Sequence, residues 1–152
     1  MSETVAYFED IDIGDEINEL DICPTTADVI RFVDVARMQS GRFTDNEYAR
    51  KEGLPGAIVP GNMSLGFLAR MLTEFFSTGM LKELTANFRV TVPHNTPLIC
   101  SGVVTEKQSR HGEHLIFCDV TLSNEEGERY VQGTAQMALP ARADQVLRPA
   151  TA

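Results

Sequence analysis

The sequence lacks any excess of positive charge. It carries 13 Lys and Arg residues against 22 Asp and Glu residues, which gives a net charge of −9. A surface this acidic repels the phosphates of nucleic acids and of anionic membranes, so we exclude both as partners. Cysteine is also scarce. Cys23, Cys100 and Cys118 form no Cys-x-x-Cys pair, and we expect free thiols in a reducing compartment.

The chain has no long apolar run either. No stretch approaches the roughly 20 apolar residues that a membrane span needs. The N-terminal stretch MSETVAYFEDID has neither the basic nor the apolar region of a signal peptide. We therefore expect a soluble, cytoplasmic protein. The 152 residues, 43% of them hydrophobic, suit a single domain over 1–152, with a core at about 7–139 and a frayed tail at 140–152.

The most informative stretch is residues 61–76, GNMSLGFLARMLTEFF, which predicts a helix. Arg70 and Glu74 are its only charged residues, whereas a surface helix carries a whole charged face. We expect this helix to be buried along most of its length.

The rest of the chain predicts strands around that helix. A strand at 16–22 precedes a helix at 27–38, with Thr26 as N-cap and Gly41 as C-cap residue. A short helix follows at 47–52. Four strands are expected at 84–92, 98–108, 114–123 and 129–139, and their short turns predict antiparallel neighbours. A sheet that curls around a buried helix is a hotdog fold, so we predict an α+β protein of that architecture.

Three segments resemble one family, the MaoC-like dehydratases, also called (R)-specific enoyl-CoA hydratases. They are FEDIDIGDEI at 8–17, SGRFTDNEYARKEGLPGAIVPGNMSLGFL at 40–68 and FRVTVPHNTPLICSGVV at 88–104. The resemblance covers about residues 7–139. It implies a dimer with two central helices beneath one continuous sheet, and a thioester of coenzyme A or of acyl carrier protein as ligand. No cofactor and no metal site are expected.

The sequence departs from the family at the catalytic residues. In the family, a loop of the type S-G-D-x-N-P-x-H supplies a catalytic aspartate and histidine. Here Ser40 and Gly41 match, but Arg42 stands at the aspartate position and the N-P-x-H step is missing. Pro60 replaces the histidine that precedes Gly61 in the family. Both halves of the acid–base pair are therefore absent from their usual places.

Five residues remain candidates for a site. The amide of Gly61, at a helix start, would polarise a thioester carbonyl, or the glycine would only permit close helix packing. Arg42 would clamp an anionic or carbonyl group, or lie in solvent. Asn62 would bond to a ligand, or be ordinary helix-start polarity, and Met63 would line an acyl tunnel or belong to the core. Asp45 is, with Asn62, a weak catalytic candidate, and its alternative role is an N-cap. His94 is interpreted as a turn residue.

These residues leave four functions open. The first is an acyl-thioester-binding subunit without catalysis, in a hetero-oligomeric hydratase with a catalytic hotdog paralogue. The second is an active hydratase or dehydratase with rewired catalytic residues, and the third is a homodimeric binding module. The fourth is a hotdog thioesterase, which fits poorly because Glu74 lies about three turns too late in the helix. Whether the protein is an enzyme stays open.

Overall fold

The computed structural model describes residues 7–142 and residue 144. The elements, in chain order, are the short 3₁₀ helix η1 (Phe8–Asp10), β1 (Glu16–Ile22), α1 (Thr26–Val35), the 3₁₀ helix η2 (Gly41–Phe43), α2 (Asn46–Lys51), α3 (Gly61–Phe75), β2 (Met80–Phe88), β3 (Leu98–Arg110), β4 (Glu113–Asn124) and β5 (Arg129–Ala138).

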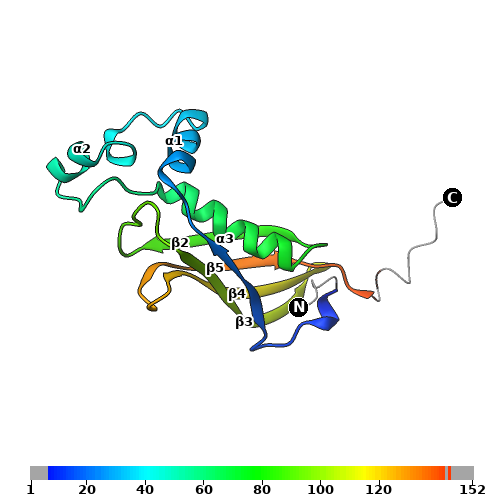
Figure 1. Ribbon diagram of the computed structural model, residues 1–152. Helices are drawn as coiled ribbons and strands as arrows, with labels where there is room; N and C mark the ends of the chain where they lie inside the picture. The colour runs from blue at the N-terminus through cyan, green and yellow to red at the C-terminus, as the bar shows by residue number, and fades with distance from the viewer. Residues whose placement is uncertain (1–6, 143, 145–152) are drawn as a thin grey trace.

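The five strands form one antiparallel sheet, and α3 lies along one of its faces (Figure 1). The strand order is β1-β3-β4-β5-β2. β3, β4 and β5 are antiparallel neighbours in this order, which confirms the prediction made from the short turns between them. The same prediction is wrong for β2, which pairs with β5 at the edge opposite β1. The connection over 89–97 therefore crosses the end of the sheet, and its Val92 carbonyl accepts a hydrogen bond from the Val59 amide at 2.7 Å.

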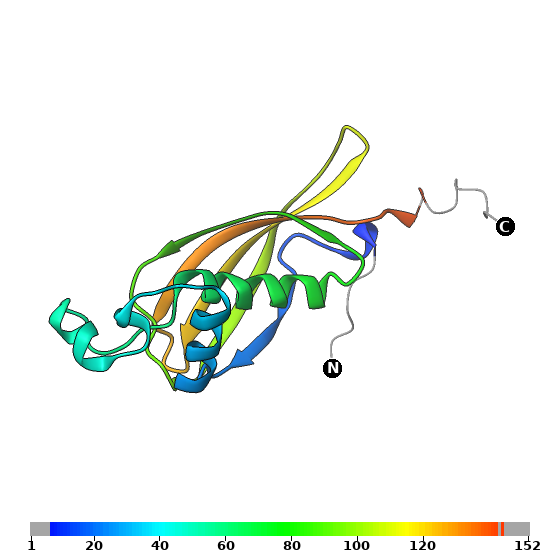
Figure 2. The same ribbon diagram turned by 90° about the horizontal axis from the view of Figure 1, so that it is seen from above.

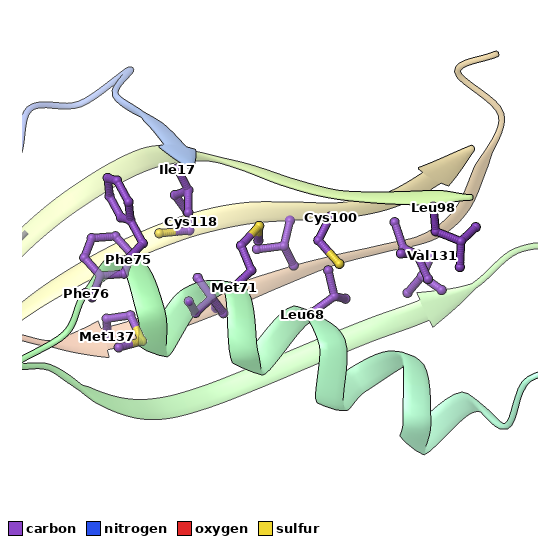
Figure 3. Close-up of a cluster of buried hydrophobic side chains, with 14 of the residues drawn as sticks. Ile17, Leu68, Met71, Phe75, Phe76, Leu98, Cys100, Cys118, Val131 and Met137 are labelled. Atoms are coloured by element: carbon purple, nitrogen blue, oxygen red, sulfur yellow. The ribbon is translucent and has the colours of Figure 1, made fainter. Parts of the chain in front are cut away.

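One face of α3 packs on the sheet. Figure 3 shows Leu68, Met71 and Phe75 of the helix against strand residues such as Cys100 and Val131. Fully burying each large apolar side chain contributes about 1.5–3 kcal/mol, so this face anchors the fold. The opposite stripe of α3 is exposed, at Asn62, Gly66, Arg70, Thr73 and Glu74. The helix is buried along most of its length, from Met63 to Phe75, as predicted, but on the side that faces the sheet.

The first helix begins and ends earlier than predicted. Thr25, not Thr26, is the N-cap: its hydroxyl accepts from the Asp28 amide at 3.1 Å, and the Asp28 carboxylate accepts from the Thr25 amide at 3.0 Å. This second bond, with Thr25 donating, lowers the pKa of Asp28. The helix ends at Val35 because Arg37 adopts a left-handed conformation with φ 55°.

Gly41 is not the cap that the sequence predicts, because it opens η2. A Cβ atom on Gly41 would lie 2.7 Å from Cγ of the Tyr48 ring. Glycine is therefore needed here for the close approach of α2.

The two ends of the described chain are held together, at the opposite end of the molecule from α1 and α2 (Figure 1). The Phe8 amide donates to the Pro140 carbonyl at 2.9 Å, and Arg142 forms an ion pair with Asp10. Of the tail predicted to fray, 143 and 145–152 lie outside the described residues, while 140–142 make these contacts. In the described part of the chain, no helix has the length and apolar character for crossing a membrane.

Candidate functional site

The start of α3 leaves two backbone amides unused. Pro60 precedes the helix in an extended conformation, with φ −60° and ψ 143°. Its carbonyl accepts hydrogen bonds from the amides of Met63 and Ser64, at 3.1 and 3.2 Å. Within the described residues, the amides of Gly61 and Asn62 have no acceptor. Together with the helix dipole, these two N–H groups favour a partial negative charge at this point.

A cavity of about 190 Å³ opens beside these amides. Its walls come from the loop before α3, the first turn of α3, the end of β2 and the connection that follows β2. The lining residues are Ile58, Val59, Gly61, Ser64, Phe88, Arg89, Val90, Thr91 and Val92.

Ser64 lies at the wall of this cavity and carries a buried hydroxyl. The residue is 0% exposed, and its Oγ has no hydrogen-bond partner in the described chain. A buried polar group without a partner costs about 1–3 kcal/mol. Because Ser64 follows Gly61 by three residues, both lie on the same side of the helix. Sequence reasoning missed Ser64, because its lack of a hydrogen-bond partner is visible only in the structure.

Phe88 closes the cavity on the strand side. It is the last residue of β2 and lies opposite Val131 of β5. A Cβ atom on Gly61 would lie 3.1 Å from Cε1 and Cζ of the Phe88 ring, so the missing side chain makes room for the ring. Phe88 is 51% exposed, so its other side faces solvent.

Among the described residues that line this cavity there is no carboxylate, imidazole or thiol. The ionisable residue on its wall is Arg89, whose Nη1 donates to Gln132 Oε1 at 2.6 Å. Proton transfer in hydration needs a positioned acid and a positioned base. The cavity offers donors that would hold and polarise a carbonyl, but no such pair.

Of the predicted site residues, Gly61 lines this cavity and the others do not. The Arg42 guanidinium lies 3.0 Å from the Glu52 carboxylate. Asn62 is exposed, and its side-chain amide donates to the Met38 sulfur at 3.5 Å. Ligand binding by these side chains stays a prediction.

Asp45 and Met63 take the structural roles that were their alternatives. Asp45 is the N-cap of α2, and its Oδ1 accepts from the amides of Glu47 and Tyr48 at 2.9 and 3.2 Å. Met63 is 9% exposed and belongs to the hydrophobic core.

A second cavity, of about 430 Å³, shares Ile58, Val90 and Thr91 with the first. His94 lines it, with Nδ1 3.1 Å from Thr26 Oγ1 and Nε2 3.2 Å from the Ile58 carbonyl. A carbonyl only accepts, so we assign the proton of neutral His94 to Nε2. Both ring nitrogens are then in use, which agrees with the interpretation of His94 as a turn residue.

A second group of chemically active side chains lies at the other end of the molecule. Ser109 Oγ is 2.9 Å from His114 Nδ1, and His114 Nε2 is 2.9 Å from Asp144 Oδ2. The order resembles a hydrolase triad. However, Ser109 is exposed on the β3–β4 hairpin, which projects from the sheet in Figure 2, and it lines neither cavity above. Phe8 packs on His114 with 5.2 Å between ring centroids, so these contacts fasten the hairpin to the chain ends.

Metal chemistry has no visible basis in this part of the chain. Over residues 7–142 and 144, no group of three or more His, Cys, Asp or Glu side chains could hold a metal ion.

No model of a known protein family matches the sequence, and no curated protein matches it. Solved structures do match. The R-hydratase PhaJ1 from Pseudomonas aeruginosa aligns with a TM-score of 0.79 and 18% identity, over 89% of this chain and 86% of that one. A MaoC-like dehydratase from Rhodospirillum rubrum aligns with a TM-score of 0.80 and 16% identity, over 95% and 99%. The chain has the hotdog fold.

A third match is a complex of two different chains. The ChsH1–ChsH2 complex from Mycobacterium tuberculosis contains a chain that aligns with a TM-score of 0.75 and 19% identity, over 84% of this chain and 98% of that one. All three matches confirm the α+β hotdog fold predicted from the sequence. At this level of identity they speak for the fold and not for the activity.

Proposed function

We propose that this hotdog protein is a MaoC-like protein that binds an acyl thioester at the start of α3 without hydrating it. The observation that carries the proposal is the small cavity at Gly61. It has the Gly61 end of α3, with its free backbone amide, and the buried hydroxyl of Ser64 beside it, and its described lining contains no carboxylate, imidazole or thiol. A thioester carbonyl accepts hydrogen bonds and is polarised by them, so it suits these donors.

We propose further that the chain acts as the binding subunit of a hetero-oligomeric hydratase, next to a catalytic hotdog paralogue. β2 is an edge of the sheet, and Met80 and Phe88 on it are exposed. An uncovered edge strand with exposed apolar side chains is a surface on which another strand can pair. A second copy of the chain is the alternative occupant, and the carrier is coenzyme A or acyl carrier protein.

The two enzymatic alternatives have less support. A rewired hydratase would work through Asp45, Asn62 or an ordered water, and neither of these two residues lines the cavity. A thioesterase would need a carboxylate near the start of α3. Glu74 lies at the far end of the helix, where its carboxylate bonds to Arg70 at 2.8 Å.

The test is hydration of crotonyl-CoA by the purified chain, followed by loss of the enoyl absorbance, with binding measured in parallel by calorimetry. We expect binding without turnover. An active (R)-specific hydratase serves as the positive control for the assay. Turnover clearly above the enzyme-free control would refute the non-catalytic role, and absence of binding would refute thioester recognition itself.

A further inference from the structure

The size of the cavity at Gly61 bears on which acyl groups it holds. A protein cavity of roughly 150 Å³ holds benzene, which has six carbon atoms. By that scale, the 190 Å³ beside Gly61 holds about seven non-hydrogen atoms. A thioester group with an acyl chain of four carbons in total has about that number.

The cavity cannot lengthen into the core. The space between α3 and the sheet is filled by side chains that are 0–1% exposed, among them Leu68, Leu98 and Val131. Figure 3 shows these three close to one another between the first half of α3 and the sheet. Packed interiors of this kind have no room for additional methylene groups.

Phe88 forms the part of the wall at the end of β2, and it differs from the core side. Its ring touches the helix start beside Gly61, yet 51% of the residue is exposed. Removing the ring would therefore open the cavity toward solvent along the end of β2, without removing a buried core side chain.

We propose that Phe88 is the specificity-determining residue of this site and restricts it to short acyl groups of about four carbons. The inference rests on the proposed thioester binding. It concerns the acyl end of the ligand alone, so it holds for either carrier.

The experiment compares butyryl-pantetheine with octanoyl-pantetheine, because pantetheine is the arm that both carriers share. The wild-type chain is expected to bind the butyryl compound at least tenfold more tightly. Phe88→Ala should raise the affinity for the octanoyl compound at least tenfold and change the butyryl affinity less than threefold. Ile13→Ala is the matched control, since Ile13 is an exposed apolar residue before β1, away from the β2 edge, and lines neither cavity. It should change neither affinity.

Equal wild-type affinities, or an unchanged preference in Phe88→Ala, would overturn the role of Phe88 while leaving thioester binding intact. If neither compound binds, the proposed function fails and this inference falls with it. Circular dichroism and the Tm check that each variant is folded. Phe88→Leu is a milder truncation, and its preference for the butyryl over the octanoyl compound should lie between those of the wild type and Phe88→Ala. If Phe88→Ala is unfolded, Phe88→Leu tests the role of Phe88 in its place.

Discussion

At the scale of single residues, Gly61 has two roles at the start of α3. It lines the cavity with a free amide, and its missing side chain leaves space for the Phe88 ring. The two roles can be separated by mutation because Pro60 already has the extended conformation that a following proline requires. Proline is also favoured at the first position of a helix.

Gly61→Pro should therefore keep the helix and delete the N–H group. We expect thioester affinity to fall roughly tenfold, which corresponds to about 1.4 kcal/mol, the scale of one hydrogen bond. Gly61→Ala keeps the N–H group, and its Cβ meets only a half-exposed ring, so its affinity should change by less than about threefold. Titration calorimetry measures both. Equal losses in the two variants would show that space at Phe88 matters and the amide does not.

At Ser64 we expect one substitution to have opposite effects on the stability of the fold and on thioester affinity. Ser64→Ala removes a buried hydroxyl that has no partner in the described chain and introduces a better helix former. We expect the free energy of unfolding to rise by about 1 kcal/mol and thioester affinity to fall severalfold. Urea unfolding and calorimetry measure the two quantities. Thr73→Ala, on the exposed stripe of the same helix, controls for helix propensity and should leave affinity unchanged. A loss of stability in Ser64→Ala would mean that the hydroxyl serves the fold.

At the scale of elements, substitutions of Asp45 at the start of α2 distinguish a helix-capping role from a catalytic one. Asparagine caps helices as well as aspartate does, but it cannot transfer a proton as a carboxylate does. Asp45→Asn is therefore expected to keep the wild-type Tm, whereas Asp45→Ala should lose about 1 kcal/mol of stability. Thermal unfolding distinguishes them.

The same two variants bear on any residual hydration of crotonyl-CoA. If Asp45→Asn abolishes such activity while its Tm stays unchanged, Asp45 is catalytic and the cap is incidental.

The sequence predicts most elements of this fold well. α3, β3, β4 and β5 lie within two residues of their expected bounds, because each has a clear helical or alternating pattern next to a turn. β2 was displaced by four residues. Val90 and Val92 extend the strand pattern, but they belong to the connection that crosses the sheet end. No sequence signal predicts the early end of α1 at Val35, since arginine rarely adopts the left-handed conformation found at Arg37.

The candidate site was predicted only in part, for a related reason. Gly61 was identified from a motif and a helix start, both of which are local in sequence. Phe88 reaches Gly61 only because β2 pairs with β5, a long-range choice that no local pattern reveals. Ser64 becomes notable only once its lack of a partner is known.

At the scale of the whole molecule, the core holds two thiols. Burial raises the pKa of Cys100 and of Cys118 to about 12, from 9.0, while Cys23 is exposed. In the folded protein, we expect a disulfide reagent at pH 8 to react quickly with Cys23 alone, and after unfolding with all three. Absorbance of the released thiol measures this. Rapid reaction of all three thiols in the folded state would contradict the burial.

The raised pKa values of Cys100 and Cys118 also predict that the free energy of unfolding falls at alkaline pH. Between pH 9 and 12 the unfolded thiols lose protons that the folded thiols retain, so the unfolded state is favoured as pH rises. The stabilisation is complete below about pH 9 and lost toward pH 12. The urea concentration at the midpoint of unfolding should be lower at pH 10.5 than at pH 8. The difference should shrink in the double variant Cys100→Ala/Cys118→Ala.

The position of Phe88 connects two properties of the molecule that are otherwise separate. It bounds the ligand cavity, and it also ends a strand that forms an open edge of the sheet. A chain that pairs along β2 would therefore alter a wall of the cavity. By thermodynamic linkage, whatever factor such pairing imposes on ligand affinity, the ligand must impose on pairing. If the chain is the binding subunit that we propose, its degree of assembly would then report whether its ligand is present.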